Sequence, residues 1–344
     1  MAIMLFAMLT TGPSAIARES HDYMNSRKDA SRQRWILRNR MVILAVAVMA
    51  GYAAFIEWAF GWAVLFREFA AVGYMPLSLA LAALVGTYFI RCWRIHDYFP
   101  AETSGRFLLL FRVTQVHNLL NIMLPLRTGE TSFPLLMRSE FGMPLARATA
   151  ALLVMRLLDL HALFAAAGIG IVIGAGYRPP AVALWFAFLL SPVAFYAMKR
   201  PVFAFLSGRL PEKLRRLVDE VDRGMPVDML AFVRAWMVTV ANWGIKVVVL
   251  AWALALMGVE PFAACFGGAL GGELSSVLPV HAPGGVGTYP AGIVAGAVSF
   301  GAPARGEAFA ILGRASVNAH LLILVSALAG TGLALLLSRR SPKT

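Results

Sequence analysis

Charged side chains inside an apolar run are the first feature of this sequence that could do chemistry. The run MRLLDLH contains Arg156, Asp159 and His161. An ionised group costs about 2.5–3.5 kcal/mol at the centre of a membrane helix, so it needs a compensating role. Arg156 and Asp159 are three positions apart and can pair across one helical turn, whereas His161 lies on another face. Two interpretations stay open: a structural ion pair, or an arginine that binds an anionic headgroup while Asp159 orients it.

Two further apolar runs also carry polar residues. Arg314 and Asn318 share a helix face, but no carboxylate lies beside this arginine. Arg314 is therefore a candidate for a phosphate or for a distant partner such as Glu130 or Glu273. Lys246 is a third cation within an apolar run, and we expect it to belong to the same kind of site.

Two motifs interrupt apolar segments with helix-breaking residues: LPLRTGETSFP over 124–134 and LPVHAPGGVGTYP over 278–290. Proline and glycine would end a helix here and expose its backbone groups. In the second motif the glycines permit close approach of a ligand to the backbone, and helix ends could meet an anion. The alternative is close packing of two hairpin tips, which needs the same small residues. The candidate binding residues of the two motifs, and of the apolar segment that leads into the first, are Asn118, Asn121, Arg127, Gly129, Glu130, Pro283, Gly284, Gly285 and Gly287.

The elements that position these residues must be membrane helices. The chain is 59% apolar and only 14% charged, with a mean hydropathy of +0.71, which excludes a soluble domain. An all-α polytopic membrane protein is predicted, because helices satisfy their own backbone groups in hydrocarbon. The net charge of +13 is better explained by basic cytoplasmic loops than by nucleic acid, so no nucleic-acid partner is expected.

The apolar runs predict about six full spans, at roughly 20 residues per span. Two more apolar segments, 107–126 and 262–280, lead into the two broken motifs and could be full spans or re-entrant hairpins. Basic residues gather in two stretches, 18–40 and 199–228. Only re-entrant hairpins place both stretches inside the cell, so the positive-inside rule favours six spans plus two hairpins, with both termini cytoplasmic. The expected full spans are 41–62, 73–92, 148–174, 181–198, 231–257 and 308–337.

This topology predicts an inverted repeat, with halves at about 41–174 and 181–337. Such repeats are common among secondary transporters. The segments that begin at Phe141 and Phe300 align without gaps, share Phe-Gly-x-Pro, and place His161 opposite His320. The repeat therefore predicts that the two hairpins enter from opposite sides and meet near the midplane.

The expected organisation is a basic cytoplasmic arm over 1–40, one transmembrane domain over 41–338 and a cytoplasmic tail over 339–344. The first residues resemble neither a signal peptide nor a span, so the start codon could be mis-assigned. Cys92 and Cys265 have no metal-ligand spacing, and we expect no metal and no cofactor.

The motifs LPLRTGE, Arg-x-x-Asp and LPVHAPGGVG, followed by a late arginine, resemble the transmembrane region of lysylphosphatidylglycerol synthases. This family is also called flippase-like or UPF0104, and the resemblance covers about residues 40–337. It implies an inner (plasma) membrane protein of lipid synthesis or translocation. The family's aminoacyl transfer belongs to a separate soluble domain, which is not expected after the last span. The family usually has an acidic residue shortly after the last glycine, where this chain has Tyr289-Pro290, and this departure puts a shared substrate in doubt.

The leading hypothesis is a lipid translocase that handles an anionic or isoprenoid-type lipid. Neither a catalytic nor a nucleotide-binding motif is found, so an enzyme is not expected. Two alternatives stay open: an intramembrane lipid-modifying enzyme, and a non-catalytic partner of an enzyme of lipid or envelope biosynthesis. The sequence leaves the oligomeric state undefined.

Overall fold

The computed structural model describes residues 43–44, 46–174, 176–207, 210–278 and 282–339. The chain divides into two compact units, Met1–Ala47 and Val48–Thr344, and the fold described below is that of the second. The arm over 1–40, with its uncertain start, and the tail beyond Arg339 lie outside the described residues.

The described part of the chain is helical throughout and contains no strand. An unlabelled helix, Val46–Ala59, comes first. The elements of the first half are then α3 (Trp62–Val72), α4 (Tyr74–Tyr98), α5 (Pro100–Thr103), α6 (Phe107–Met123), the 3₁₀ helix η1 (Pro125–Thr131), α7 (Ser132–Phe141) and α8 (Leu145–Gly174). Those of the second half are α9 (Pro179–Ala197), α10 (Lys199–Ser207), α11 (Glu212–Gly224), α12 (Met229–Leu256), α13 (Phe262–Val277), the 3₁₀ helix η2 (Pro283–Gly285), α14 (Thr288–Ser299) and α15 (Gly306–Arg339).

Five of the described helices, α4, α8, α9, α12 and α15, are long and apolar enough to cross a membrane. A sixth span arises if Val46–Ala59 and α3 count as one, although they meet at an angle of 84°. The prediction of a polytopic all-α membrane protein is therefore confirmed. The helix of the expected span over 41–62, which the structure describes only in part, ends near the expected boundary, because the chain turns at Gly61, whose φ of 76° lies in the left-handed region.

The described residues of both broken motifs lie at the turn of a helical hairpin. In the first half α6, η1 and α7 make one hairpin, and in the second half α13, η2 and α14 make the other. The 3₁₀ helices at the two turns contact each other. Gly129 packs against α6 so closely that a Cβ would lie 2.5 Å from the Cα of Asn121. The small residues of these motifs therefore serve close packing, while the depth of the hairpins in a membrane stays a prediction.

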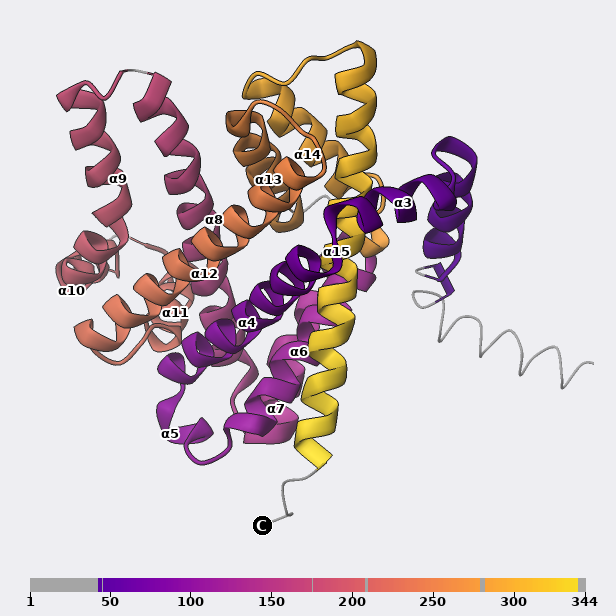
Figure 1. The fold of residues 1–344 in the computed structure, drawn as a ribbon. Helices are drawn as coiled ribbons and strands as arrows, with labels where there is room; N and C mark the ends of the chain where they lie inside the picture. Colours follow the sequence, from indigo (N-terminus) through magenta and orange to yellow (C-terminus); the bar gives the residue numbers. More distant parts are fainter. Residues whose placement is uncertain (1–42, 45, 175, 208–209, 279–281, 340–344) are drawn as a thin grey trace, which may run out of the picture. The chain divides into compact units, whose positions relative to one another are not determined.

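Each half contains a long helix, a hairpin and a second long helix in that order, and the two sets pack reciprocally. Helix α6 packs on α15 as α13 packs on α8, and α4 packs on α15 as α12 packs on α8. The equivalent helices α4 and α12 lie against each other (Figure 1). They run antiparallel, since Asp97 pairs with Arg234 while Arg94, one turn earlier, bonds Thr239, one turn later. Antiparallel packing of equivalent helices is what an inverted repeat requires.

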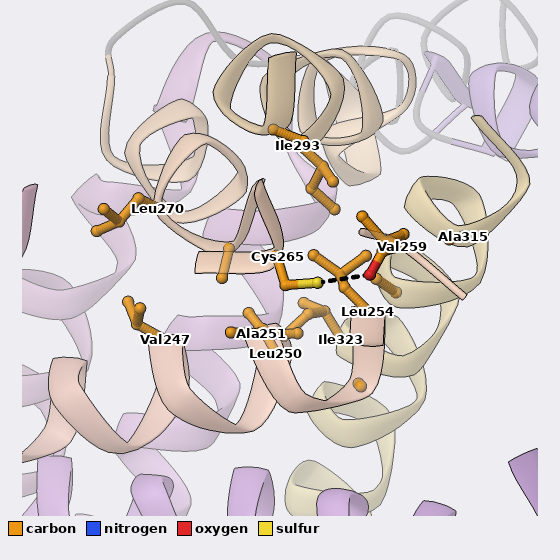
Figure 2. Close-up of a cluster of buried hydrophobic side chains, with 14 of the residues drawn as sticks. Val247, Leu250, Ala251, Leu254, Val259, Cys265, Leu270, Ile293, Ala315 and Ile323 are labelled. Carbon is orange, nitrogen blue, oxygen red and sulfur yellow. Dashed lines mark hydrogen bonds between the residues drawn. The ribbon is translucent and has the colours of Figure 1, made fainter. Parts of the chain in front are cut away.

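The apolar interior consists of two main clusters. One joins the second hairpin to α12 and α15, where Leu254, Leu270, Ile293 and Ile323 surround Cys265 (Figure 2). The other joins α4, α6, α7 and α8. Because these two clusters pack the hairpins against long helices, the polar residues between them are held in fixed positions.

Candidate functional site

A polar cavity of about 60 Å³ lies where the two hairpin tips meet α4, α8, α12 and α15. A cavity of this size holds a few water molecules. The predicted site residues that line it are Asn118, Asn121, Arg156, Lys246, Gly284 and Gly285. The remaining lining includes Tyr88, Arg91, Trp243, Glu273, Tyr289 and His320. The structure thus brings together residues of both broken motifs and both halves, as the repeat predicts.

Arg91 is the cation of this cavity with the weakest compensation. Its guanidinium donates to the Asn118 side-chain oxygen over 2.9 Å and lies 5.9 Å from the centre of the Trp243 ring. Among the described residues no carboxylate lies within ion-pair distance of Arg91, and its Nε atom is buried without a hydrogen bond. The Asn118 amide nitrogen, also buried, has no acceptor. Buried donors without acceptors favour an anionic or acceptor-rich ligand at this point.

Lys246 pairs with Glu273 in the same cavity. Its Nζ lies 2.8 Å from the carboxylate and 4.9 Å from the Trp243 ring centre. Tyr289 donates to the other oxygen of Glu273 over 3.1 Å. A carboxylate from α13 therefore lies beside Tyr289, near the position where the resemblance would place an acidic residue. The departure at Tyr289-Pro290 does not leave the cavity without a carboxylate.

Arg156 and Asp159 form the ion pair that their spacing predicts, at 3.3 Å. Asp159 is 1% exposed, and its main partners are residues that the sequence did not single out: Arg94 at 2.5 Å and the Trp243 indole, which donates over 2.8 Å. The expected span over 73–92 ended too early, because α4 continues to Tyr98 and carries Arg94 into the interior. The sequence contains a pattern that predicts this longer helix, because Arg91 and Arg94 lie on the same helical face as Thr87.

Arg127 and Glu130 link the first hairpin tip to the second. Arg127 has a φ of 55°, in the left-handed region, and donates to Glu130 and to the backbone carbonyls of Val277 and Leu278. Glu130 also lies 2.8 Å from Arg156. The tips are therefore joined by a side chain of one hairpin and the backbone of the other.

Eight of the predicted site residues do not line the cavity. Arg127, Gly129, Glu130 and Asp159 make the contacts given above, and Pro283 is buried in η2. The other three are Arg314, Asn318 and Gly287. Arg314 pairs with Glu68 of α3 at 2.5 Å, and the Asn318 amide donates to the same carboxylate over 3.4 Å, so the expected partners Glu130 and Glu273 are wrong. Gly287, with a φ of 72°, precedes α14 and does not line the cavity. Its left-handed backbone shows why a glycine occurs there.

The fold and this site define a polytopic helical membrane protein with a buried, cation-rich cavity between two helical hairpins. The chain belongs to the family of the lysylphosphatidylglycerol synthase transmembrane region, whose family model matches residues 42–338. No curated protein and no solved structure gives a significant match to this chain. Family membership makes this a membrane protein related to lipids.

Proposed function

We propose that this protein moves a membrane lipid with an anionic headgroup from one leaflet to the other, as a transporter of the plasma membrane and not as an enzyme. The headgroup passes through the cavity, and the apolar chains stay outside it. The observation that carries this proposal is Arg91, a cavity-lining cation for which the described residues provide no carboxylate. A phosphate fits such a site, because a guanidinium binds its oxygens in a bidentate geometry.

The charge balance of the cavity supports an anion over a cation. Its lining contains Arg91, Arg156 and Lys246 but one carboxylate, that of Glu273. The nearby Asp159 is already shared between Arg94 and Arg156. At about 60 Å³ the cavity is too small for a complete lipid headgroup, so translocation requires the hairpins to move apart.

The proposal is tested by reconstituting the protein in liposomes that contain phosphatidylglycerol with a fluorescent acyl chain. Loss of fluorescence after an impermeant quencher is added reports how much of the probe has changed leaflet. Wild-type protein should move the probe, and Arg91→Gln should slow this movement about tenfold, because one charge-assisted contact is lost. The variant should still fold, since it removes a buried charge without leaving an unpaired carboxylate behind.

Two further variants complete this test. Arg112→Gln is the matched control, because Arg112 pairs with Glu140 at a site where both side chains are about one third exposed. The double variant Lys246→Met with Glu273→Gln keeps the cavity's charge balance but removes its ion pair, and should also be slow. Equal rates for wild type, Arg91→Gln and Arg112→Gln would exclude the cavity as the route, and an inactive wild type would exclude translocation of this lipid.

A further inference from the structure

A second hollow, which we call the side groove, lies beside the polar cavity and is about ten times larger. It has a volume of about 600 Å³ and runs between α8, α11 and η1. Its walls are mainly apolar: Leu145, Leu152 and Leu153 of α8, Val221 of α11 and Val277 of α13. The role of the cavity does not account for this groove, because most of its wall is apolar and suits hydrocarbon chains better than a headgroup.

The groove is a built feature of the packing of α11 on α8. These helices touch through Gly224, where a Cβ would lie 2.6 Å from the backbone nitrogen of Ala151. This close approach fixes the end of α11, and Glu220 and Val221, about one turn before it, line the hollow together with Thr149 and Leu153 of α8. Helix α11 is strongly amphipathic, as a helix at a membrane surface would be.

The side chain of Arg156, with its two ion pairs, lies at the boundary between the groove and the cavity. Arg156 and Val277 line both hollows, and they are the residues that the two linings share. The Arg156 guanidinium is held across this boundary by Glu130 on the groove side, at 2.8 Å, and by Asp159 on the interior side, at 3.3 Å. Movement of the Arg156 side chain would therefore remove one of the two residues that separate the hollows, and the other, Val277, is held by Arg127 through its main-chain oxygen.

The inner end of the groove has an excess of positive charge. Arg127 and Arg156 share the carboxylate of Glu130 there, and the second carboxylate near Arg156, that of Asp159, is already paired with Arg94. The other acidic lining residue, Glu220, is on the opposite wall and is already paired with Arg223 of its own helix, at 2.8 Å. Two arginines around one carboxylate can accept a phosphate in its place, because a phosphate offers more acceptor oxygens to the same two guanidinium groups.

We infer that the side groove is a lateral binding site for a single phospholipid, with its acyl chains against α8 and α11 and its phosphate at Arg127 and Arg156. The phosphate displaces Glu130, which frees Arg156 to swing and opens the boundary to the cavity. The Arg156–Glu130 pair is thus the gate that an anionic headgroup opens by competition. This inference rests on the proposed function for its purpose, but the binding site itself can be tested without any transport.

The test uses photocrosslinking of the full chain in nanodiscs, with two probes that carry the same diazirine-labelled acyl chains. One probe is phosphatidic acid and the other is diacylglycerol, which lacks the phosphate. We expect phosphatidic acid to label peptides of α8 and α11 that line the groove. Thr149→Trp should lower this labelling about tenfold by filling the groove, since Thr149 is an exposed lining residue. Leu157→Trp is the matched control, because Leu157 lies on the same helix, is 58% exposed and does not line the groove.

The gate is tested by Glu130→Gln with the same probes. Removing the competing carboxylate should raise labelling by phosphatidic acid about tenfold and leave labelling by diacylglycerol unchanged. Labelling that Thr149→Trp does not reduce, or that is equal for Glu130→Gln and wild type, would overturn the inference. Groove labelling by a protein that moves no lipid would instead overturn the proposed function and leave the site standing.

Discussion

Asp159 is the carboxylate that neutralises two arginines of the interior, Arg94 and Arg156. It accepts from Arg94 and from the Trp243 indole, and it lies 3.3 Å from Arg156. These partners come from α4, α12 and α8 itself, so one carboxylate joins three long helices. Since the side chains of Asp159 and Arg94 are 1% and 5% exposed, neither can exchange its partner for water.

Asp159→Asn should therefore destabilise the protein by about 3–5 kcal/mol, because it leaves Arg94 without its carboxylate in the interior and Arg156 with Glu130 alone. The measurement is unfolding of the purified variant by denaturant in detergent. Arg112→Gln provides the comparison, since its exposed pair with Glu140 should contribute about 0–1 kcal/mol. Similar unfolding midpoints for the two variants would show that the Asp159 cluster is not structural.

The sequence identified individual charged residues of the site better than their partners. Arg156 with Asp159, and Arg127 with Glu130, are close in the chain, so helical spacing was enough to pair them. Arg314 was assigned to the wrong carboxylates, because Glu68 is 246 positions away and no local rule connects them. Arg94 was assigned to a loop because hydropathy ends a span at a charge, whereas a buried partner removes the cost that this rule assumes.

At the scale of elements, the second hairpin is built from glycines that let two backbones touch. A Cβ on Gly271 of α13 would overlap the Gly292 carbonyl oxygen of α14, and one on Gly296 would overlap the Gly267 carbonyl oxygen. Small residues at such crossings replace the hydrophobic driving force that helices lack in lipid. Because α14 packs on α15 and carries Tyr289, this crossing also sets the position of one cavity wall.

Gly271→Leu should destabilise the protein by about 1–3 kcal/mol or more, because the side chain must force α13 away from α14. Unfolding in detergent measures the loss. Gly244→Ala is the matched glycine control: Gly244 is inside α12 and a Cβ there meets nothing within 4 Å. That variant should gain about 0.5–1 kcal/mol from its better helix propensity. A Gly271→Leu protein as stable as wild type would contradict the close crossing.

Most elements could be predicted from apolar runs and helix breakers, including both hairpins. The turn at Gly61 could not be predicted, because the residues on both sides are apolar and hydropathy gives no information on the direction of a helix. A second contact that could not be predicted is made by the amphipathic helix over Glu212–Gly224. The structure shows that this helix, α11, packs on α8, which depends on the backbone contact of Gly224 and not on its charge pattern.

At the scale of the whole molecule, the reciprocal packing of the halves implies two related conformations. If α6 and α13 are equivalent, a movement that opens the cavity along one hairpin has a counterpart along the other. The structure itself is not symmetric in its polar contacts. Arg127 reaches from the first hairpin tip to the second, while the groove lies on the side of α8 and α11. An opening along the first hairpin and an opening along the second would therefore expose different polar groups, even if the helices moved in the same way.

The orientation of the repeat can be checked with single cysteines in a background where Cys92 and Cys265 are replaced by alanine. The exposed positions Arg138, Arg178 and Arg305 each receive a cysteine. A membrane-impermeant maleimide added to intact cells should label Arg178→Cys and Arg305→Cys, and should label Arg138→Cys only after permeabilisation. Labelling of Arg138→Cys in intact cells would favour eight full spans over six spans with two re-entrant hairpins.

The contact between the hairpin tips restricts the choice of amino acid in the first hairpin more than in the second. Arg127 donates to the main-chain oxygens of Val277 and Leu278, which every amino acid carries. A saturation library should therefore tolerate many side chains at 278, where the residue is half exposed, but few at 127. The contact between the hairpin tips thus depends on the identity of one residue, Arg127, and the opposing tip can vary in sequence without losing it.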